Sequence, residues 1–254
     1  AQCPEATFTL TGESQVVADT RTFDLDLAIT GMSIPDRNPA TGFLGEAFDA
    51  VVDEYAPQGT MDVTVTAHRD PHGGVTYRGA ITPQNMTVCY KYFPLEIDEV
   101  TGVIAFDQTG IGPIDLTGRR GEARVDVTGI VRRSTDGEFW LYDVTVEAFN
   151  VPLDDSVKEA IPHRMMSVWE SLNPEGSAAI LAHASRLETG ASALEIVLDF
   201  KGQASITYEE FPYRLEALFG TVTIEGNEVH IDRSMPLTGS HGATACTIYG
   251  DVTE

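Results

Sequence analysis

Apolar and polar residues alternate along several stretches of the chain, as they do in β-strands with one buried face. In MDVTVTAH (61–68), Met61, Val63 and Val65 fall on one face and polar residues on the other. ARVDVTGIV (123–131) and LEIVLDF (194–200) behave similarly. Turn sequences lie between such stretches: RDPHGG (69–74), STDGE (134–138), LETGAS (187–192) and IEGNE (224–228). The pattern predicts an antiparallel, mainly β fold with some helix (α+β).

Two stretches instead have the period of an amphipathic helix, and each follows a proline corner, SIPD (33–36) or NVPLDD (150–155). Pro162 divides the second stretch, which predicts a short helix from Asp154 to Ala160 and another from Pro162 to Leu172. A helix with an apolar stripe buries it against the apolar face of a sheet. The two stripes, 117 residues apart, are Leu44, Phe48, Val51 and Tyr55, and Ile161, Met165, Val168 and Leu172.

The chain also resembles itself. YFPLEIDEVTG (92–102) matches EFPYRLEALFG (210–220) at an offset of 118 residues, EATFTLTG (5–12) matches EARVDVTG (122–129) at 117, and LTGRRG (116–121) matches LTGSHG (237–242) at 121. A fixed period of this kind indicates a repeat architecture. We expect a tandem repeat of two units of about 118 residues, each an antiparallel twisted sheet with one short helix, in an elongated arrangement. Residues 1–12 would be the closing strand of a preceding unit, 13–129 the first unit and 130–254 the second, in a chain processed or excised from a longer precursor.

The composition limits the partners. With 39 acidic and 16 basic residues, the formal charge of −23 repels phosphate backbones, so nucleic acid is not expected as a partner. We interpret the acidity as a solubility feature. No apolar run reaches the about 18 residues that a membrane span requires.

Three cysteines, Cys3, Cys89 and Cys246, are far apart and form no CxxC pair, so neither a zinc cluster nor a redox motif is present. The sequence leaves open one disulfide with an odd thiol left over. Cys246 stands where matched segments have Phe8 and Val125, which favours a small buried hydrophobe over a nucleophile.

Candidate chemistry is sparse. His68, Asp70 and His72 are weak metal-ligand candidates at a predicted hairpin tip, and His230 and His241 read as surface histidines without an obvious partner. The chain has no GxSxG, SxxK, GxGxxG or GxxxxGK[ST] motif, so we expect neither an enzyme nor a cofactor.

Aromatic residues gather at two matched YxxFP segments. In a lipid groove they would line its mouth, and in a closed fold they would fill the space between sheet and helix. The residues are Tyr90, Tyr92, Phe93, Tyr208, Phe211 and Tyr213; we assign Phe93 and Phe211, with the two helical stripes, to the lining of an apolar groove or core.

Three segments carry a family resemblance: 149–184, 208–231 and 237–252, which include NVPLDD, EFPYRLEALFG and LTGSHG. They resemble the repeated β-rich segments of large AsmA-like and TamB-like envelope proteins, in particular the long AsmA-like proteins of planctomycete-type bacteria. The resemblance implies a sheet curling into a groove, a membrane anchor elsewhere in the full protein, a periplasmic or outer-membrane-associated location in the bacterial envelope, and a part in phospholipid movement or envelope assembly. Its motifs are structural, and no catalytic signature comes with it.

We therefore expect a non-enzymatic envelope segment whose partners are neighbouring repeat units and phospholipid, with self-association through sheet edges. The alternative is a purely structural or adhesive repeat without a ligand, and a third hypothesis is a metal-dependent or carbohydrate-active hydrolase. An apolar sheet face that is open to solvent favours the lipid hypothesis, whereas a face closed by the helices favours the scaffold hypothesis. A lipid-binding face must be continuously apolar, because an unpaired polar group against hydrocarbon costs free energy.

Overall fold

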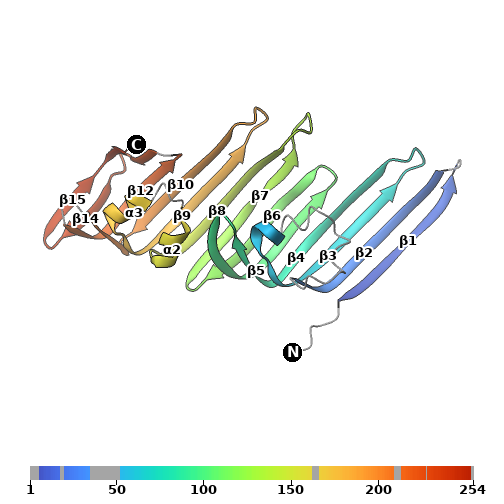
Figure 1. The fold of residues 1–254 in the computed structure, drawn as a ribbon, viewed down its shortest axis with the longest axis horizontal. Helices are drawn as coiled ribbons and strands as arrows, with labels where there is room; N and C mark the ends of the chain where they lie inside the picture. The colour runs from blue at the N-terminus through green and yellow to red at the C-terminus, as the bar shows by residue number, and fades with distance from the viewer. Residues whose placement is uncertain are drawn as a thin grey trace. The chain divides into compact units, whose positions relative to one another are not determined.

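The computed structural model describes residues 6–17, 20–34, 52–161, 166–208, 213–226 and 228–252. Within these ranges, sixteen strands form one large sheet with few, short helices (Figure 1). Neighbours in the main hydrogen-bonded path follow the order β1-β2-β3-β4-β5-β6-β7-β8-β9-β10-β12-β13-β16, with β11, β14 and β15 pairing beside it. The registers that are defined are all antiparallel.

The first eight strands are β1 (Thr7–Val17), β2 (Thr20–Ile34), β3 (Gln58–Arg69), β4 (Val75–Tyr90), β5 (Phe93–Asp107), β6 (Gly110–Arg120), β7 (Ala123–Arg133) and β8 (Trp140–Pro152). The later strands are β9 (Glu175–Arg186), β10 (Ser192–Lys201), β11 (Ala204–Thr207), β12 (Arg214–Glu225), β13 (Glu228–Ile231), β14 (Leu237–His241), β15 (Thr244–Ile248) and β16 (Gly250–Val252). The helices are α2 (Asp155–Ala160) and α3 (Met166–Leu172), and residues 52–55 form a helical turn.

The predicted mainly β fold is confirmed, and the alternating stretches are strands. In β3, Met61 and Val63 are buried while Thr64 and Thr66 are exposed. The four predicted turn sequences lie at the ends of strands, where the chain reverses or, at 134–138, passes from β7 to β8. Period-two patterning therefore located the strands because one face of this sheet is apolar and the other is polar.

By its internal contacts the chain divides into two units. Unit 1 comprises Ala1–Lys91, Glu96–Gly118 and Val127–Tyr142, and unit 2 comprises Tyr92–Leu95, Arg119–Asp126 and Asp143–Glu254.

Each unit has its own apolar core on one face of its strands. In unit 1 the buried residues are Ile29, Met32, Ile34, Met61, Val63, Met86 and Val100, and Val52 of the helical turn packs against them. In unit 2 they are Ala178, Phe200, Ala204, Ile206, Leu218 and Leu237, and Leu172 of α3 packs against them. We call this the helix face of each unit and the opposite side the outer face.

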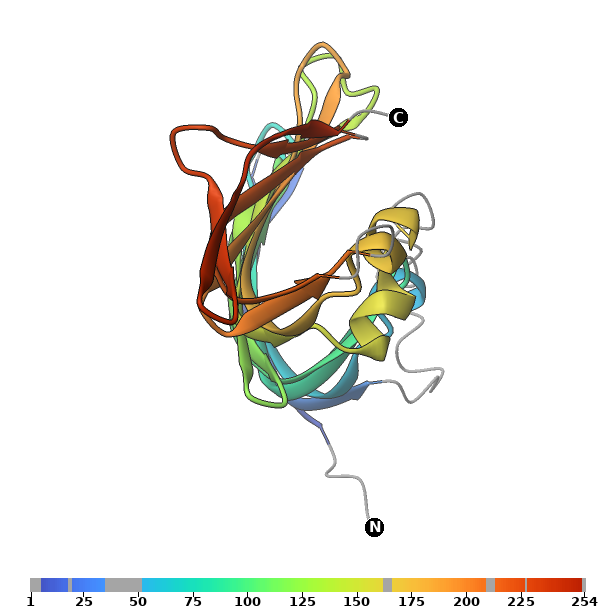
Figure 2. The ribbon, with the colours of Figure 1, turned by 90° about the vertical axis from the view of Figure 1, so that its left-hand side faces the viewer.

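The first helix of unit 2, α2, begins within one residue of the predicted start, and α3 ends at Leu172 as predicted, while the predicted start at Pro162 lies outside the described residues. Asp154 caps α2 by accepting the Val157 N–H at 3.0 Å, and Val157 and Ala160 are buried. The ion pair of Lys158 with Glu170 (3.3 Å) links α2 to α3. Figure 2 shows both helices on the same side of the bent strands of this unit. Of the predicted stripes, Leu44, Phe48, Val51 and Met165 lie outside the described residues, as do Pro162 and the Val168 side chain.

Several strands bend at residues in the left-handed backbone region. Glu99 in β5 has φ 53° and Ala217 in β12 has φ 49°, and the pairing of β12 with β14 changes register between Glu216 and Phe219. The connections that lead into β3 and β9 also contain one left-handed residue each, Ala56 and Asn173, both with φ 39°. A change of register such as the one between β12 and β14 bends a strand and increases its twist.

Candidate functional site

The helix face of unit 1 changes character along its strands. Near the helical turn it is closed, with Met61 only 4% exposed. Further along β2, β3 and β4, Leu27, Val65 and Ile81 are half-buried. Leu27 lies directly opposite Val65, and Ile81 lies opposite the buried Val63. At the far rim, Tyr77 lies opposite Ala67 and is 42% exposed. The apolar face therefore opens toward solvent away from the helical turn.

Unit 2 has the same gradient. Ala178 is buried near α3, whereas Ile180 and Leu198 face each other across β9 and β10 and are half-buried. Leu194 at the far rim lies opposite Ala184 and is 41% exposed. Neither unit thus has its helix face fully covered within the described residues.

In the described residues, β3 of unit 1 and β9 of unit 2 each end in an arginine on this face, and exposed Arg21 of β2 lies on the same face of unit 1. Arg69 ends β3 in the same alternation phase as Met61, and Arg186 ends β9 in the same phase as Ala178. Both side chains are half-buried, and their Nε atoms have almost no contact with solvent. The two positions are 117 residues apart. Sequence reasoning missed them, although the phase of the alternation places each of them on the apolar face.

The outer face of unit 1 is a network of polar cross-strand contacts. The Asp24 carboxylate lies 2.6 Å from His68 Nδ1, and the Asp26 carboxylate accepts from Thr66 Oγ1 at 2.8 Å. The Asp62 carboxylate accepts from Gln84 Nε2 at 3.1 Å. These pairs join neighbouring strands. The two faces of unit 1 therefore differ sharply in polarity.

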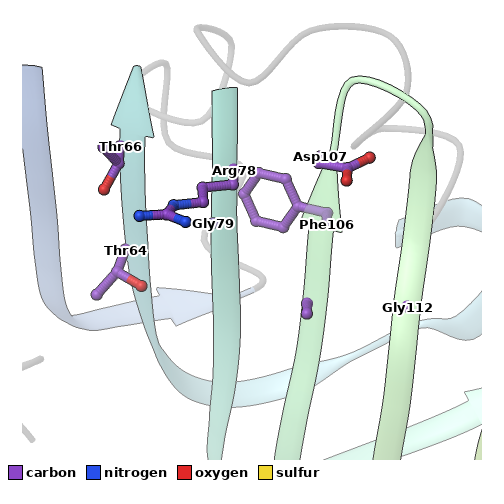
Figure 3. A pocket seen from close by; sticks show the side chains of 8 residues that line it. Thr64, Thr66, Arg78, Gly79, Phe106, Asp107 and Gly112 are labelled. Carbon is purple, nitrogen blue, oxygen red and sulfur yellow. The ribbon is translucent and has the colours of Figure 1, made fainter. Parts of the chain in front are cut away.

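A shallow hollow of about 350 Å³ lies over β3 to β6 of unit 1 (Figure 3). The guanidinium of Arg78 extends toward Thr64 and Thr66, and the ring of Phe106 projects toward Gly79, where it occupies the space that a Cβ would take. The lining of the hollow contains no nucleophile–base pair. Its lining is Thr64, Thr66, Arg78, Gly79, Ala105, Phe106, Asp107 and Gly112.

The weak metal candidates are committed to other contacts. His68 binds Asp24 across the strands, and Asp70 accepts the backbone N–H groups of His72 (2.7 Å) and Gly74 (3.1 Å) within the hairpin turn. These hydrogen bonds, that of Gly74 first, hold the pKa of Asp70 below its usual value. Among the described residues, no group of three or more His, Cys, Asp and Glu side chains is placed to hold a metal ion.

His230 and His241, for which the sequence shows no obvious partner, both have one in the structure. His230 Nδ1 lies 2.8 Å from Asp251 and its Nε2 lies 3.4 Å from Glu228. His241 Nδ1 lies 2.9 Å from the carbonyl oxygen of Arg214, and its ring is 4.1 Å from that of Tyr213. These contacts depend on strand register, which the sequence does not display.

The aromatic cluster lies at the surface rather than deep in a core. Tyr92 is 68% exposed, Phe93 36% and Tyr208 42%, while Tyr90 stacks on Tyr55. Phe211 lies outside the described residues. Of the remaining stripe positions, Ile161 follows α2 and donates its N–H to the Val157 carbonyl oxygen at 3.1 Å.

Cys89 and Cys246 are free thiols, each half-buried, and Cys3 lies outside the described residues. Cys246 lies in β15 opposite Gly239, so it is a partly covered strand residue rather than a fully buried one. Within the described part of the chain, no helix is both long enough and apolar enough to cross a membrane.

Comparisons of the chain with family models, with curated proteins and with solved structures gave no match.

Proposed function

We propose that this chain is a non-enzymatic, β-rich segment of a large AsmA-like or TamB-like protein of the bacterial cell envelope, and that its helix face contacts phospholipid. The observation that carries the proposal is the opening of the apolar face toward solvent, where Val65 and Leu198 are half-buried and Tyr77 and Leu194 are exposed. Exposed apolar patches of this kind mark contact surfaces for protein or lipid.

The proposal includes the organisation into two repeated units. Backbone conformation at matched positions supports it: Gly102 and Gly220, 118 residues apart, have φ 126° and 124°. Side-chain space supports it too. A Cβ added at Gly118 would lie 3.1 Å from the Asp98 carbonyl oxygen, and one at Gly239 would lie 3.1 Å from that of Glu216.

Buried residues of the two cores also occur at positions 118 residues apart. Met86 and Ala204 are buried members of the two clusters, as are Val100 and Leu218, and each pair is 118 residues apart. One backbone plan with different side chains accounts for both units.

Native mass spectrometry of the chain purified in the presence of bacterial phospholipid tests the lipid proposal. Asn at Val65 or Leu198 places an unpaired amide on the helix face, and we expect it to reduce the bound lipid. Matched controls change the outer face: Thr64→Asn next to Val65, and Leu181→Asn, whose residue is 40% exposed on the strand beside Leu198.

The expected result is lipid on the wild type and both controls and less lipid on Val65→Asn and Leu198→Asn, with circular dichroism unchanged. Protein that carries no lipid in any form would overturn the lipid proposal.

A second candidate is a scaffold that assembles through a sheet edge. β1 stands at the end of the strand order, all eleven of its residues are exposed, and the strand contains no Lys, Arg or Pro to block pairing. Phe8 and Leu10 are 56% and 66% exposed. In sedimentation velocity, self-association that Leu10→Lys abolishes would favour this candidate, and a monomer at all concentrations would count against it.

A further inference from the structure

We propose that Arg69 forms a binding site for the anionic headgroup of an amphiphile whose hydrocarbon chain lies on the helix face of unit 1. The inference rests on the proposed lipid contact and adds to it a headgroup chemistry and a residue that recognises it. It begins from a half-buried cation at the rim of a mainly apolar surface, where Arg21 of β2 is exposed and Arg69 is not.

No ion pair of Arg69 is found among the described residues. Phe23 and Val75 lie directly opposite it on the two neighbouring strands, and neither is acidic. Its Nε is shielded from solvent and has no hydrogen-bond partner within the part of the chain that the structure describes. A buried polar group without a partner costs free energy, so a ligand oxygen at this position would stabilise the site.

The nearby carboxylates are committed to contacts elsewhere. Asp70 accepts the turn amides of His72 and Gly74, and Asp24 contacts His68 on the outer face. Guanidinium groups bind phosphate and carboxylate oxygens in a planar, bidentate geometry. The chemistry that fits Arg69 is therefore an anionic headgroup.

The apolar surface beside Arg69 has the dimensions of an acyl chain. From Val65 to Arg69 the strand extends about 13 Å, close to the about 15 Å that one leaflet contributes to a bilayer core. Tyr77 and Val75 border this surface and are 42% and 51% exposed. Headgroup and chain would thus meet a cation and a hydrocarbon surface in the order that an amphiphile presents them.

The negative net charge makes a preference for anionic lipid a specific test of the Arg69 site. A chain of formal charge −23 repels anionic lipid overall, so without a local cation it would prefer a zwitterionic headgroup. A preference for the anionic headgroup has to come from a specific site. Arg186 occupies the matched position in unit 2, on the helix face at the end of β9.

The experiment measures binding of fluorescently labelled phosphatidylglycerol and phosphatidylcholine to the whole chain. The variant is Arg69→Gln, and the control is Arg78→Gln, because Arg78 lies opposite Thr66 on the outer face (Figure 3). We expect the wild type and Arg78→Gln to bind phosphatidylglycerol roughly tenfold more tightly than phosphatidylcholine, and Arg69→Gln to lose that preference while still binding phosphatidylcholine.

The other outcomes are distinct. Binding of both lipids without a preference, or a preference that survives Arg69→Gln, would overturn the headgroup site and leave the proposed lipid contact standing. Binding of neither lipid would overturn both. The Arg69 Nε–H NMR resonance is also followed on addition of inorganic phosphate alone. A shift as large as that with lipid would show that the site binds only the ion and would overturn the proposed amphiphile site.

Discussion

The rings of Tyr55 and Tyr90 stack with their centroids 5.0 Å apart and their planes 22° from parallel. The contact joins the helical turn at 52–55 to the end of β4, and the Lys91 N–H strengthens the junction by donating to the Glu54 carbonyl oxygen at 2.8 Å. Partial burial of Tyr55, which remains 42% exposed, raises its pKa to about 12, with smaller contributions from Glu54 and Tyr90.

This pKa predicts a loss of stability in strong alkali. Because the folded-state pKa of Tyr55 lies above the value of 10.0 for an ordinary tyrosine, the stabilisation is complete below pH 10 and is lost as pH rises toward 12. A spectrophotometric titration of tyrosinate should show one late transition that Tyr55→Phe removes. Loss of an ordinary transition near pH 10 in that variant would contradict the assignment.

Two matched glycines should be equally intolerant of a side chain. Gly102 and Gly220 have φ 126° and 124°, and a Cβ at either would run into a backbone carbonyl oxygen, that of Asp115 in β6 or that of Pro236 just before β14. Replacing either by Ala should cost about 1–3 kcal/mol of unfolding free energy, measured by urea denaturation.

The controls are hairpin glycines at another matched pair, Gly121 and Gly242, with φ 58° and 57° and open space around them. Asn adopts this left-handed conformation readily, so Gly121→Asn and Gly242→Asn should change stability by only about 0.5 kcal/mol. Unequal costs for the Ala variants at 102 and 220 would count against two units with one backbone plan.

The start of α2 depends on one carboxylate. Asp154→Ala removes the acceptor of the Val157 N–H and should cost about 1 kcal/mol, whereas Asp154→Asn keeps an oxygen there and should cost less. Asp155→Ala, in the first turn but not at the cap, is the control. Equal melting temperatures of Asp154→Ala and Asp155→Ala in thermal unfolding would contradict the assignment of Asp154 as the cap.

His230 should titrate above its ordinary pKa of 6.5. The hydrogen bond that His230 donates to the Asp251 carboxylate raises the pKa most, with further contributions from the charges of Asp251, Glu228 and Glu225. The stabilisation is therefore complete below pH 6.5 and disappears as pH rises through the folded-state pKa.

NMR titration of the imidazole protons checks this prediction. Asp251→Asn should lower the midpoint of His230, while Asp143→Asn, which alters the partner of His183, should leave it unchanged. A midpoint that is the same in wild type and Asp251→Asn would show that the pair does not act on His230.

The sequence predicted features that depend on local pattern. Alternation identified β3 and β10, and the NVPLDD corner placed the short helix at Asp154 to Ala160, where the structure has Asp154 as the cap of α2. Contacts between strands were not predictable in the same way. The pair of His230 with Asp251 requires a register between β13 and β16 that no local pattern encodes.

The bends were also hidden from sequence reasoning. Neither Glu99 nor Ala217 favours the left-handed region, so no residue preference indicates it. The openness of the helix face was likewise not predictable, because it depends on how far a helix extends along the strands and not on which residues alternate.

The bends in β5 and β12 affect how such a chain can change during evolution. Both strands turn at the same relative place with unrelated side chains, Glu99 and Ala217. Because curvature there is a property of the backbone, mutations can replace most surrounding residues without reshaping the strand. Homologues could then share little beyond a few glycines and prolines, and the shape would persist long after the sequences had ceased to be alignable.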